Sequence, residues 1–348
     1  MGTIRANTST PYDIVIGQGI LGRCGDVVRD LFPEGQTVIV TDDNVEPLYL
    51  EKLKRSFQRR DIECVAFIIP NGEGSKSTDI YTELLEFLAK RDMTKSDFIT
   101  ALGGGVVGDL AGFAAASYLR GIPYIQIPTT LLAAVDSSVG GKTAINLGSG
   151  KNLVGAFHQP SLVWCDCATH ETMDPLRYAD GIAEVVKYAV LKGGDLFTLL
   201  EKENLYKHVE EIIEECVNLK LKIVTADEFD EGQRQFLNLG HTLGHAIEAK
   251  SRFEISHGHA VACGMVAMAD VAALNGLADY DCADRISQVL KRYGLPTKMP
   301  YDYRELIPYI KNDKKRRGNK IKLIIPENIG RCRMISLPVK DLASFFRV

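Results

Sequence analysis

The stretch DFITALGGGVVGDLAGFAAASYL (Asp97–Leu119) joins a short apolar strand pattern to a helical pattern of small residues through a run of glycines. Gly103, Gly105 and Gly108 have the G-x-G-x-x-G spacing, and a helix N-terminus after such a turn offers N–H groups to a phosphate. The acidic residue that a Rossmann site needs about 20 residues later is missing, and an acidic pair, Asp42 and Asp43, occurs instead at the end of an earlier strand. The stretch therefore favours a dinucleotide site of non-Rossmann arrangement over a tight turn that only serves helix packing.

The same alternation of elements extends around this stretch. The short β-branched runs YDIVIG, TVIVTD and CVAFIIP precede it and are separated by helical patterns, which is typical of βαβ units and a parallel sheet. After about residue 170 long amphipathic helical patterns dominate, and a late hairpin is expected around NIG. We therefore predict an α/β NAD-binding domain over residues 1–172 and a mainly helical domain for metal and substrate over 173–348, with the ligand in the cleft between them.

The overall composition limits the class of protein. The chain has 348 residues, of which 45% are hydrophobic and 25% charged, and a net charge of −4, which is ordinary for a soluble globular protein. No apolar run approaches about 18 residues, so we expect no membrane span and no signal segment. The eight cysteines are scattered, as expected of free thiols in a reducing cytoplasm. One dense basic run, Lys311–Lys320, is either a solvated turn or an anion site, and no nucleic-acid surface is expected.

Histidines gather in one part of the chain. Of the seven in the sequence, four fall within nineteen residues: His241, His245, His257 and His259. The first two are four residues apart on a helical pattern and so share a face. A catalytic metal needs three protein ligands. Glu184 on an apolar helix pattern, one turn before Lys187, is a candidate, and His257 or His259 at the start of the next helical pattern could complete the set. The alternative is a set of core or interface histidines without a metal, and the absence of HExxH argues against a metalloprotease.

A second polar cluster lies in DSSVGGKTAINLGSGKNLVGAF (Asp136–Phe157). Lys142, Lys151 and Asn152 fall among glycines, and lysines on such turns can hold an anion. The alternative is a solvated loop, although its flanking residues are apolar.

Several motifs together resemble one known family. GGGVVGDLAGFAAASYLRG, IPTTLLAAVDSSVGGKTAIN, GKNLVGAF, AEVVKY, LNLGHTLGHAIEA and HGHAVACGM occur in the order found in the 3-dehydroquinate synthases, which are sugar-phosphate cyclases. The resemblance covers nearly the whole chain and implies NAD and Zn²⁺, with Co²⁺ as the alternative ion. It implies that Glu184, His241 and His257 hold the metal, whereas His245 contacts the substrate near its phosphate and moves protons.

The resemblance also implies the remaining site residues. The phosphate would be met by Lys142, Asn152, Asn238, Lys314 (or Lys315) and, from the other subunit of a homodimer, Arg120. The ring hydroxyls would be met by Asp136 and Lys187, and the carboxylate by Lys220 and Arg234. NAD would lie along Asp42, Asn71, Gly72, Glu73, Gly74, Ser75, Lys76, Gly105, Val106, Val107, Gly108, Asp109, Thr129, Thr130, Lys142, Lys151, Thr169, His170, Glu171 and Thr172. We expect Arg234 to share a helix face with His241, two turns away.

Three positions depart from the family pattern. His259 stands where an acidic residue is usual, Asn71 where aspartate is common, and the loop INLGSGKN lacks the usual proline.

The activity that the resemblance implies is that of a lyase of the shikimate pathway, in aromatic amino acid biosynthesis. It converts 3-deoxy-D-arabino-heptulosonate 7-phosphate to 3-dehydroquinate and phosphate by oxidation with NAD⁺, elimination, reduction and aldol closure. The alternatives are another sugar-phosphate cyclase, a metal-dependent polyol dehydrogenase, and a non-enzymatic regulatory NAD-binding module.

Overall fold

The computed structural model describes residues 1–311 and 319–348. The chain divides into two compact units: Met1–Met173 with Lys220–Phe229, and Asp174–Leu219 with Asp230–Val348. The first unit is α/β and the second is mainly helical, as the sequence pattern predicts. The segment Lys220–Phe229 groups with the first unit, whereas the sequence pattern predicted a single boundary near residue 172.

The first unit is built on a seven-stranded sheet with the order β1-β2-β9-β6-β5-β3-β4. Its strands are β1 (Gly2–Ala6), β2 (Tyr12–Gly17), β3 (Thr37–Asp42), β4 (Cys64–Ile69), β5 (Phe98–Gly103), β6 (Tyr124–Pro128) and β9 (Leu162–Asp166). All neighbours are parallel except β1 and β2, which are antiparallel. The sequence analysis did not predict β1, so the glycine turn follows the fifth strand and not the fourth.

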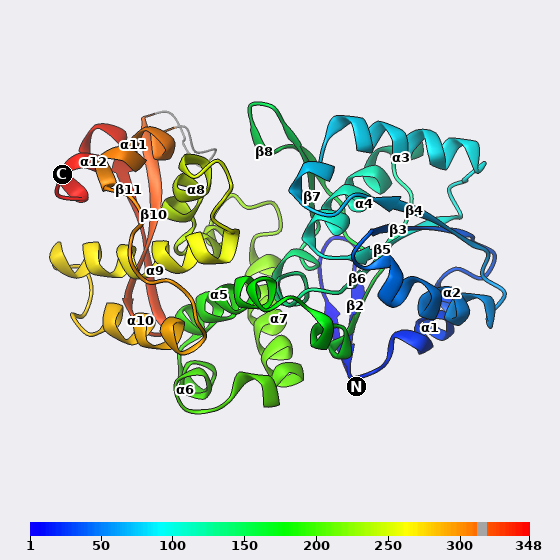
Figure 1. Cartoon of the computed structure of the whole chain (residues 1–348), viewed down its shortest axis with the longest axis horizontal. Helices are drawn as coiled ribbons and strands as arrows, with labels where there is room; N and C mark the ends of the chain where they lie inside the picture. The colour runs from blue at the N-terminus through cyan, green and yellow to red at the C-terminus, as the bar shows by residue number, and fades with distance from the viewer. Residues whose placement is uncertain (312–318) are drawn as a thin grey trace. The chain divides into compact units, whose positions relative to one another are not determined.

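Helices cover both faces of this sheet. Along β3, Val38 and Val40 belong to one core cluster and Ile39 to the other, because successive strand residues point to opposite faces. The α helices are α1 (Cys24–Leu31), α2 (Glu51–Gln58), α3 (Thr78–Lys90) and α4 (Gly105–Ser117). The short 3₁₀ or π turns are Leu21–Arg23, Glu46–Leu50, Glu73–Ser75, Tyr118–Arg120, Ala133–Ser137 and Cys167–Thr172. Helices α1 and α2 pack on the face of Ile39, and α3 and α4 on the other (Figure 1).

The glycine-rich cluster after residue 136 contains a separate antiparallel hairpin, β7 (Lys142–Leu147) with β8 (Gly150–Phe157). The alternative of a loop is therefore wrong, although the expected solvation is found on β8, which is largely exposed. Lys142 and Lys151 lie on strands and not on turns as the glycine spacing suggested. Gly155 is required by the pairing, because a Cβ there would lie 2.1 Å from the carbonyl oxygen of Thr143.

The second unit packs helices around a two-stranded sheet. Its helices are α5 (Pro175–Lys192), α6 (Gly194–Lys202), α7 (Val209–Ala226, whose end groups with the first unit), α8 (His241–Lys250), α9 (His257–Leu274), α10 (Cys282–Arg292), α11 (Tyr303–Lys311) and α12 (Leu342–Phe345). The short 3₁₀ turns are Leu205–Lys207, Gln233–Asn238 and Val339–Asp341. The predicted hairpin is confirmed as β10 (Lys320–Asn328) and β11 (Arg331–Pro338).

Helix α9 is the central apolar element of the second unit. Among the described helices it alone is long and apolar enough to span a membrane, and 78% of that window is buried inside the protein. Ala260, Met268 and Val271 of α9 pack in one cluster with Leu243 of α8 and Leu323 of β10. The apolarity of α9 is thus accounted for by core packing.

Candidate metal and cofactor sites

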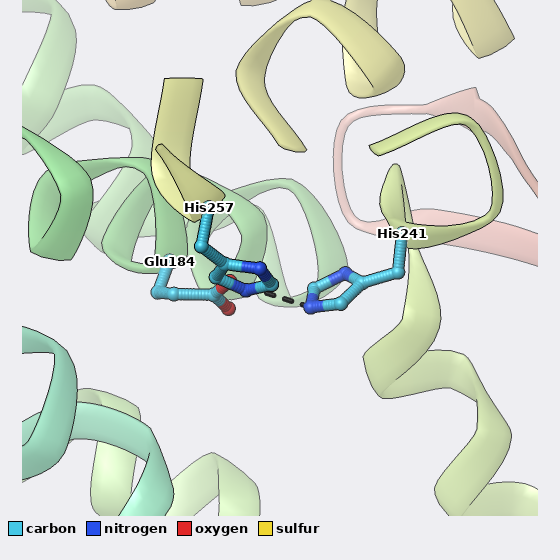
Figure 2. A group of neighbouring side chains, drawn as sticks. All are labelled: Glu184, His241 and His257. Atoms are coloured by element: carbon cyan, nitrogen blue, oxygen red, sulfur yellow. Dashed lines mark hydrogen bonds and ion pairs between the residues drawn. The ribbon is translucent and has the colours of Figure 1, made fainter. Parts of the chain in front are cut away.

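Three predicted ligands meet in the second unit. Glu184 lies in the middle of α5, whereas His241 and His257 are the first residues of α8 and α9 (Figure 2). The Oε1 atom of Glu184 is 3.4 Å from Nε2 of His241 and 3.2 Å from Nε2 of His257. One donor atom from each residue falls within 4.8 Å of the other two. Two imidazole nitrogens and one carboxylate oxygen form a donor set that Zn²⁺ or Co²⁺ accepts, so the residues fit a metal.

Both histidines are held so that Nε2 faces Glu184. The Nδ1–H of His241 donates to the carbonyl oxygen of Leu239 at 3.0 Å. The Nδ1–H of His257 donates to Oε2 of Glu248 at 3.0 Å. Sequence reasoning missed Glu248, although a glutamate on the apolar pattern of α8 was a signal that could have identified it.

The carboxylate of Glu184 carries its charge in a buried position. Its side chain and that of Lys187 are each 1% exposed, and Lys187 Nζ lies 2.5 Å from Oε2. Burial would raise the pKa of Glu184, but Lys187 and then His241 outweigh it and hold the pKa well below its usual range. Burial lowers the pKa of His241 despite the opposing effect of Glu184. Burial alone would lower the pKa of His257, but hydrogen bonds to Glu184 and Glu248 raise it to about 10.

His245 lies beside the three ligands and is exposed. Its ring centroid is 5.5 Å from that of His241 and 6.1 Å from that of His257. His241 and His245 therefore share one side of α8, as their spacing predicts.

Arg234 and Asn238 also belong to this unit but not to helix α8. They lie in the 3₁₀ turn Gln233–Asn238, so the prediction that Arg234 shares a helix face with His241 is wrong. The helix begins only after Gly240, which has a φ of +77° and where a Cβ would lie 2.8 Å from the carbonyl oxygen of Val261. Arg234 is 2% exposed, so this cation is buried. The predicted phosphate contact Lys314 (or Lys315), with most of the basic run, lies outside the described residues.

A second polar group ties the start of α9 to α5. The Ser256 hydroxyl donates to Oδ1 of Asp180 at 2.5 Å, and Nδ1 of His259 lies 3.1 Å from the same oxygen. Gly258 makes this approach possible, because a Cβ there would lie 2.3 Å from Cα of Asp180. His259 thus lies next to the predicted metal ligands without joining them, and it pairs with the carboxylate of Asp180.

In the first unit, two glycines of the turn before α4 are required by packing, and a third begins the helix. A Cβ on Gly103 would lie 2.6 Å from Val107, and one on Gly108 would lie 2.6 Å from Gln126 Oε1. Helix packing therefore explains these two glycines without any ligand. Gly105 begins α4, which leaves its N–H groups at the carboxyl ends of the strands.

Several polar atoms near this edge are buried without a hydrogen-bond partner among the described residues. They are Oγ1 of Thr41, at the end of β3, Oγ1 of Thr129, after β6, Oγ of Ser137, and both ring nitrogens of His170. A Cβ on Gly105 would lie 3.0 Å from Oγ of Ser137, so this hydroxyl lies beside the start of α4. Buried polar atoms normally have partners, so these atoms fit a polar ligand such as NAD.

The predicted NAD segments are joined by hydrogen bonds. Asn71 donates to Oδ1 of Asp43 through its backbone N–H at 2.9 Å and its side chain at 2.8 Å. Asp42 instead accepts from the backbone N–H groups of Asn44 and Val45. Asp43, and not the predicted Asp42, therefore accepts the hydrogen bonds from Asn71 at the start of the turn 71–76.

Lys76 links α4, the helix after the glycine turn, to the hairpin of β7 and β8. It is 4% exposed, lies 2.6 Å from Oδ2 of Asp109, and donates to the side-chain oxygen of Asn152. Lys151 lies 4.0 Å from Glu73 Oε2, whereas Lys142 is exposed. Thr130 follows β6 next to Thr129, whose hydroxyl is orphaned, whereas Thr169 and Thr172 lie in the 3₁₀ turn after β9.

Asp136 and Lys220 form an ion pair within the first unit. Lys220 is 5% exposed, and its Nζ donates to the carboxylate and, at 2.5 Å, to the carbonyl oxygen of Asp136. Arg120 is exposed and has a φ of +67°, next to Leu119 at +49°. Such values are unusual outside glycine.

Comparison with known families identifies relatives along most of the chain. The family model described as 3-dehydroquinate synthase N-terminal matches residues 66–180, and the one described as 3-dehydroquinate synthase C-terminal matches residues 181–316. A 3-dehydroquinate synthase from Streptococcus suis (strain 05ZYH33) is 42% identical over 347 residues, which cover 98% of each chain.

Two solved structures resemble this one over their whole length. A 2-deoxy-scyllo-inosose synthase complexed with carbaglucose-6-phosphate, NAD⁺ and Co²⁺ is 25% identical, with a TM-score of 0.88 and 99% coverage of each chain. A 2-epi-5-epi-valiolone synthase from Streptomyces hygroscopicus subsp. jinggangensis 5008, with NAD⁺ and Zn²⁺ bound, is 25% identical with a TM-score of 0.88, covering 99% of this chain and 98% of the other.

Proposed function

This chain belongs to the 3-dehydroquinate synthase family, and we propose that Glu184, His241 and His257 hold the catalytic metal for that family's reaction. The reaction converts 3-deoxy-D-arabino-heptulosonate 7-phosphate to 3-dehydroquinate and phosphate. The observation that carries the proposal is the approach of two Nε2 atoms and one carboxylate oxygen within 4.8 Å. A bound Zn²⁺ or Co²⁺ would supply a Lewis acid at a substrate hydroxyl.

The first unit would hold NAD along the edge where α4 begins. The orphaned hydroxyls of Thr129 and Ser137 support this assignment, and so does the N-terminus of α4. Bound there, NAD⁺ would supply a temporary oxidation at C5 of the substrate, which would acidify the neighbouring C–H bond so that phosphate could leave. Because a later step of the reaction reduces the substrate again, NAD⁺ would be regenerated in every cycle.

Protein side chains would bind and orient the substrate. In the second unit, Arg234 would meet the carboxylate, Asn238 and Lys314 the phosphate, and Lys187 a ring hydroxyl. In the first unit, Lys220 would add a second cation for the carboxylate, Asp136 would meet a ring hydroxyl, and Lys142 and Asn152 would meet the phosphate. The short contact between Asp136 and Lys220 supports a site in which both charges are already oriented.

His245 would transfer protons in this reaction. Its exposed ring lies beside the two ligand histidines without a place in the ligand group around Glu184. General acid–base help of this kind contributes about 10²–10⁴-fold to a rate.

A homodimer would complete the site with Arg120 from the partner subunit. The strained, exposed backbone at Leu119 and Arg120 supports this proposal, because strain of this kind tends to occur where a side chain has a specific task. The enzyme would be cytoplasmic, where its free cysteines would stay reduced.

The alternative activities make different demands on the site. A cyclase for a hexose phosphate or a neutral heptulose phosphate has no carboxylate to hold, so it leaves the buried Arg234 and Lys220 without a substrate partner. A polyol dehydrogenase needs neither these cations nor a phosphate site, and it consumes NAD⁺.

The test is to supply the heptulosonate phosphate with NAD⁺ far below the substrate concentration and to follow phosphate and absorbance at 340 nm. Phosphate should greatly exceed the NAD⁺ added, and NADH should not accumulate. Parallel reactions with sedoheptulose 7-phosphate and glucose 6-phosphate are the controls. Faster turnover of either control substrate would reject the assignment, and stoichiometric NADH would indicate a dehydrogenase.

A further inference from the structure

A buried carboxylate outside the predicted ligand set touches the metal site. Glu248 lies seven residues after His241 on α8, close to two full turns, so both side chains point to the same side of the helix. Glu248 is 3% exposed, and its Oε2 accepts a hydrogen bond from Nδ1–H of His257 at 3.0 Å. A buried glutamate needs a compensating partner, and here that partner is a proposed ligand.

The contact determines which nitrogen of His257 can face the metal. A proton on Nδ1 leaves the lone pair on Nε2, the atom that lies 3.2 Å from Glu184. The other ligand histidine has the same arrangement with a weaker acceptor, because Nδ1–H of His241 donates to the neutral carbonyl of Leu239. A carboxylate acceptor makes the imidazole a more basic ligand than a carbonyl does.

We propose that Glu248 is a positioning residue that orients His257 and strengthens its bond to the metal. The inference rests on the proposed metal site, since without a metal the hydrogen bond has no ligand to orient. His257 is the most exposed of the three ligands, with 32% of its side chain accessible, against 12% for His241 and 1% for Glu184. Packing constrains it least, so an oriented hydrogen bond affects it most.

The contact between Glu248 and His257 also allows a competing interpretation, a second metal site. His245, Glu248 and His257 also bring three donor atoms within 4.8 Å of one another and could hold a second ion. That ion would need the Nδ1 lone pair of His257, which is lost when Nδ1 donates a proton to Glu248. The two interpretations therefore predict different numbers of metal ions per chain.

The test measures metal affinity and the electronic structure of the site in E248A and E248Q. Zinc affinity comes from competition with a chromophoric chelator, and the coordination from the visible spectrum of Co²⁺-substituted protein. E248A should lose about 10–100-fold in zinc affinity, which is typical when such a partner is removed. E248Q keeps an acceptor oxygen without the charge, so it should recover part of the affinity while its Co²⁺ spectrum remains shifted from that of wild type.

Two further variants make the result decisive. E327Q is the matched control, since Glu327 is a similarly buried glutamate of the same unit that pairs with Arg331 and Arg333, and it should keep wild-type zinc affinity. E184Q tests the metal site itself. If E184Q loses zinc but E248A and E248Q keep wild-type affinity and spectra, the role of Glu248 is wrong and the metal site stands. If E184Q keeps full affinity, the metal site is wrong.

The number of zinc ions per chain distinguishes the positioning role of Glu248 from a second metal site. One zinc ion per chain in wild type and in E248Q supports the positioning role. Two ions in wild type and one in E248A would overturn it in favour of a second metal site. Metal-free melting temperatures and circular dichroism identify an unfolded variant, and if E248A does not fold, E248Q alone decides.

Discussion

Asp180 and Glu184 lie one turn apart on α5, and each contacts the first turn of α9. Asp180 accepts from Ser256 just before that helix, whereas Glu184 faces its first residue, His257. The proposed metal ligand Glu184 and the structural contact of Asp180 therefore join the same two helices, one turn apart. This arrangement depends on a close approach of the two backbones at Gly258.

Replacing Gly258 by alanine should separate α9 from α5. The new Cβ would lie 2.3 Å from Cα of Asp180, so the backbones must move apart, and we expect a loss of about 1–3 kcal/mol in the free energy of unfolding. The position of His257 should shift with the helix, so zinc affinity should fall as well. Denaturant unfolding and chelator competition measure the two effects. Gly148→Ala, where nothing lies within 4 Å of the new Cβ, is the control.

Replacing His257 and His259 by alanine, one at a time, tests which of them holds the metal. His257→Ala should remove both stoichiometric zinc and activity, because it deletes one of three donor atoms. His259→Ala should keep zinc, because Nδ1 of His259 faces Asp180 and not Glu184. Zinc content by mass spectrometry is the measurement. Loss of zinc in His259→Ala together with retention in His257→Ala would reverse the assignment.

Removing the buried Arg234 should affect the carboxylate-bearing substrate specifically. Leaving one half of a buried ion pair unpaired costs about 3–5 kcal/mol. At 1.36 kcal/mol per tenfold, kcat/KM of Arg234→Ala should fall by about two to four orders of magnitude. Zinc and NAD binding should stay close to wild type. Arg304→Ala, an exposed arginine of the same unit, is the control, and an equal loss there would argue against a specific role.

A shared site should show complementation between inactive subunits. Arg120→Ala and His245→Ala should each be nearly inactive as homodimers. After subunit exchange, one site of the mixed dimer would have both wild-type residues, so part of the activity should return. The measurement is phosphate release before and after mixing, with exchange followed by a mass tag. Proven exchange without recovered activity would contradict the contribution of Arg120 across the interface.

His170 should weaken the fold at acidic pH. Burial lowers its pKa to about 4, whereas the unfolded chain protonates a histidine near 6.5. Between these values the unfolded state binds a proton that the folded state does not, so this contribution to stability is lost as the pH falls. The full difference is about 3 kcal/mol.

The check is the pH dependence of the free energy of unfolding for wild type and His170→Leu without NAD. The variant should lose less stability than wild type between pH 7 and pH 4.5, and the gap between the two should stop changing above pH 7. A gap that is constant over the whole range would show that the ring does not titrate in this way.

Some features of the site could be predicted from local sequence. The spacing of His241 and His245 places them on one side of a helix, and the apolar pattern around Glu184 and Lys187 indicates buried charges that need partners. The glycine run after an apolar strand indicates a turn into a helix. These properties depend on the period of a single element, so a short stretch of sequence contains them.

Tertiary structure decided how these elements meet. Gly240 interrupts the helical pattern before His241 because α8 packs against Val261 and Met265, residues more than twenty positions away in the chain. Lys220, within α7, pairs with Asp136 of the other half of the sequence.

The sequence by itself determined the alternation of strands and helices and the glycine turn, because helix and strand periods are local. It also offered Glu184 and four histidines as metal-ligand candidates, among which only the resemblance to a known family selected three. Only the tertiary structure showed that Glu248 supports His257 and that His259 turns to Asp180. The physical reason is that a buried polar group is stable only with a partner. Which partner it has depends on how distant helices pack, and no spacing along the chain contains that information.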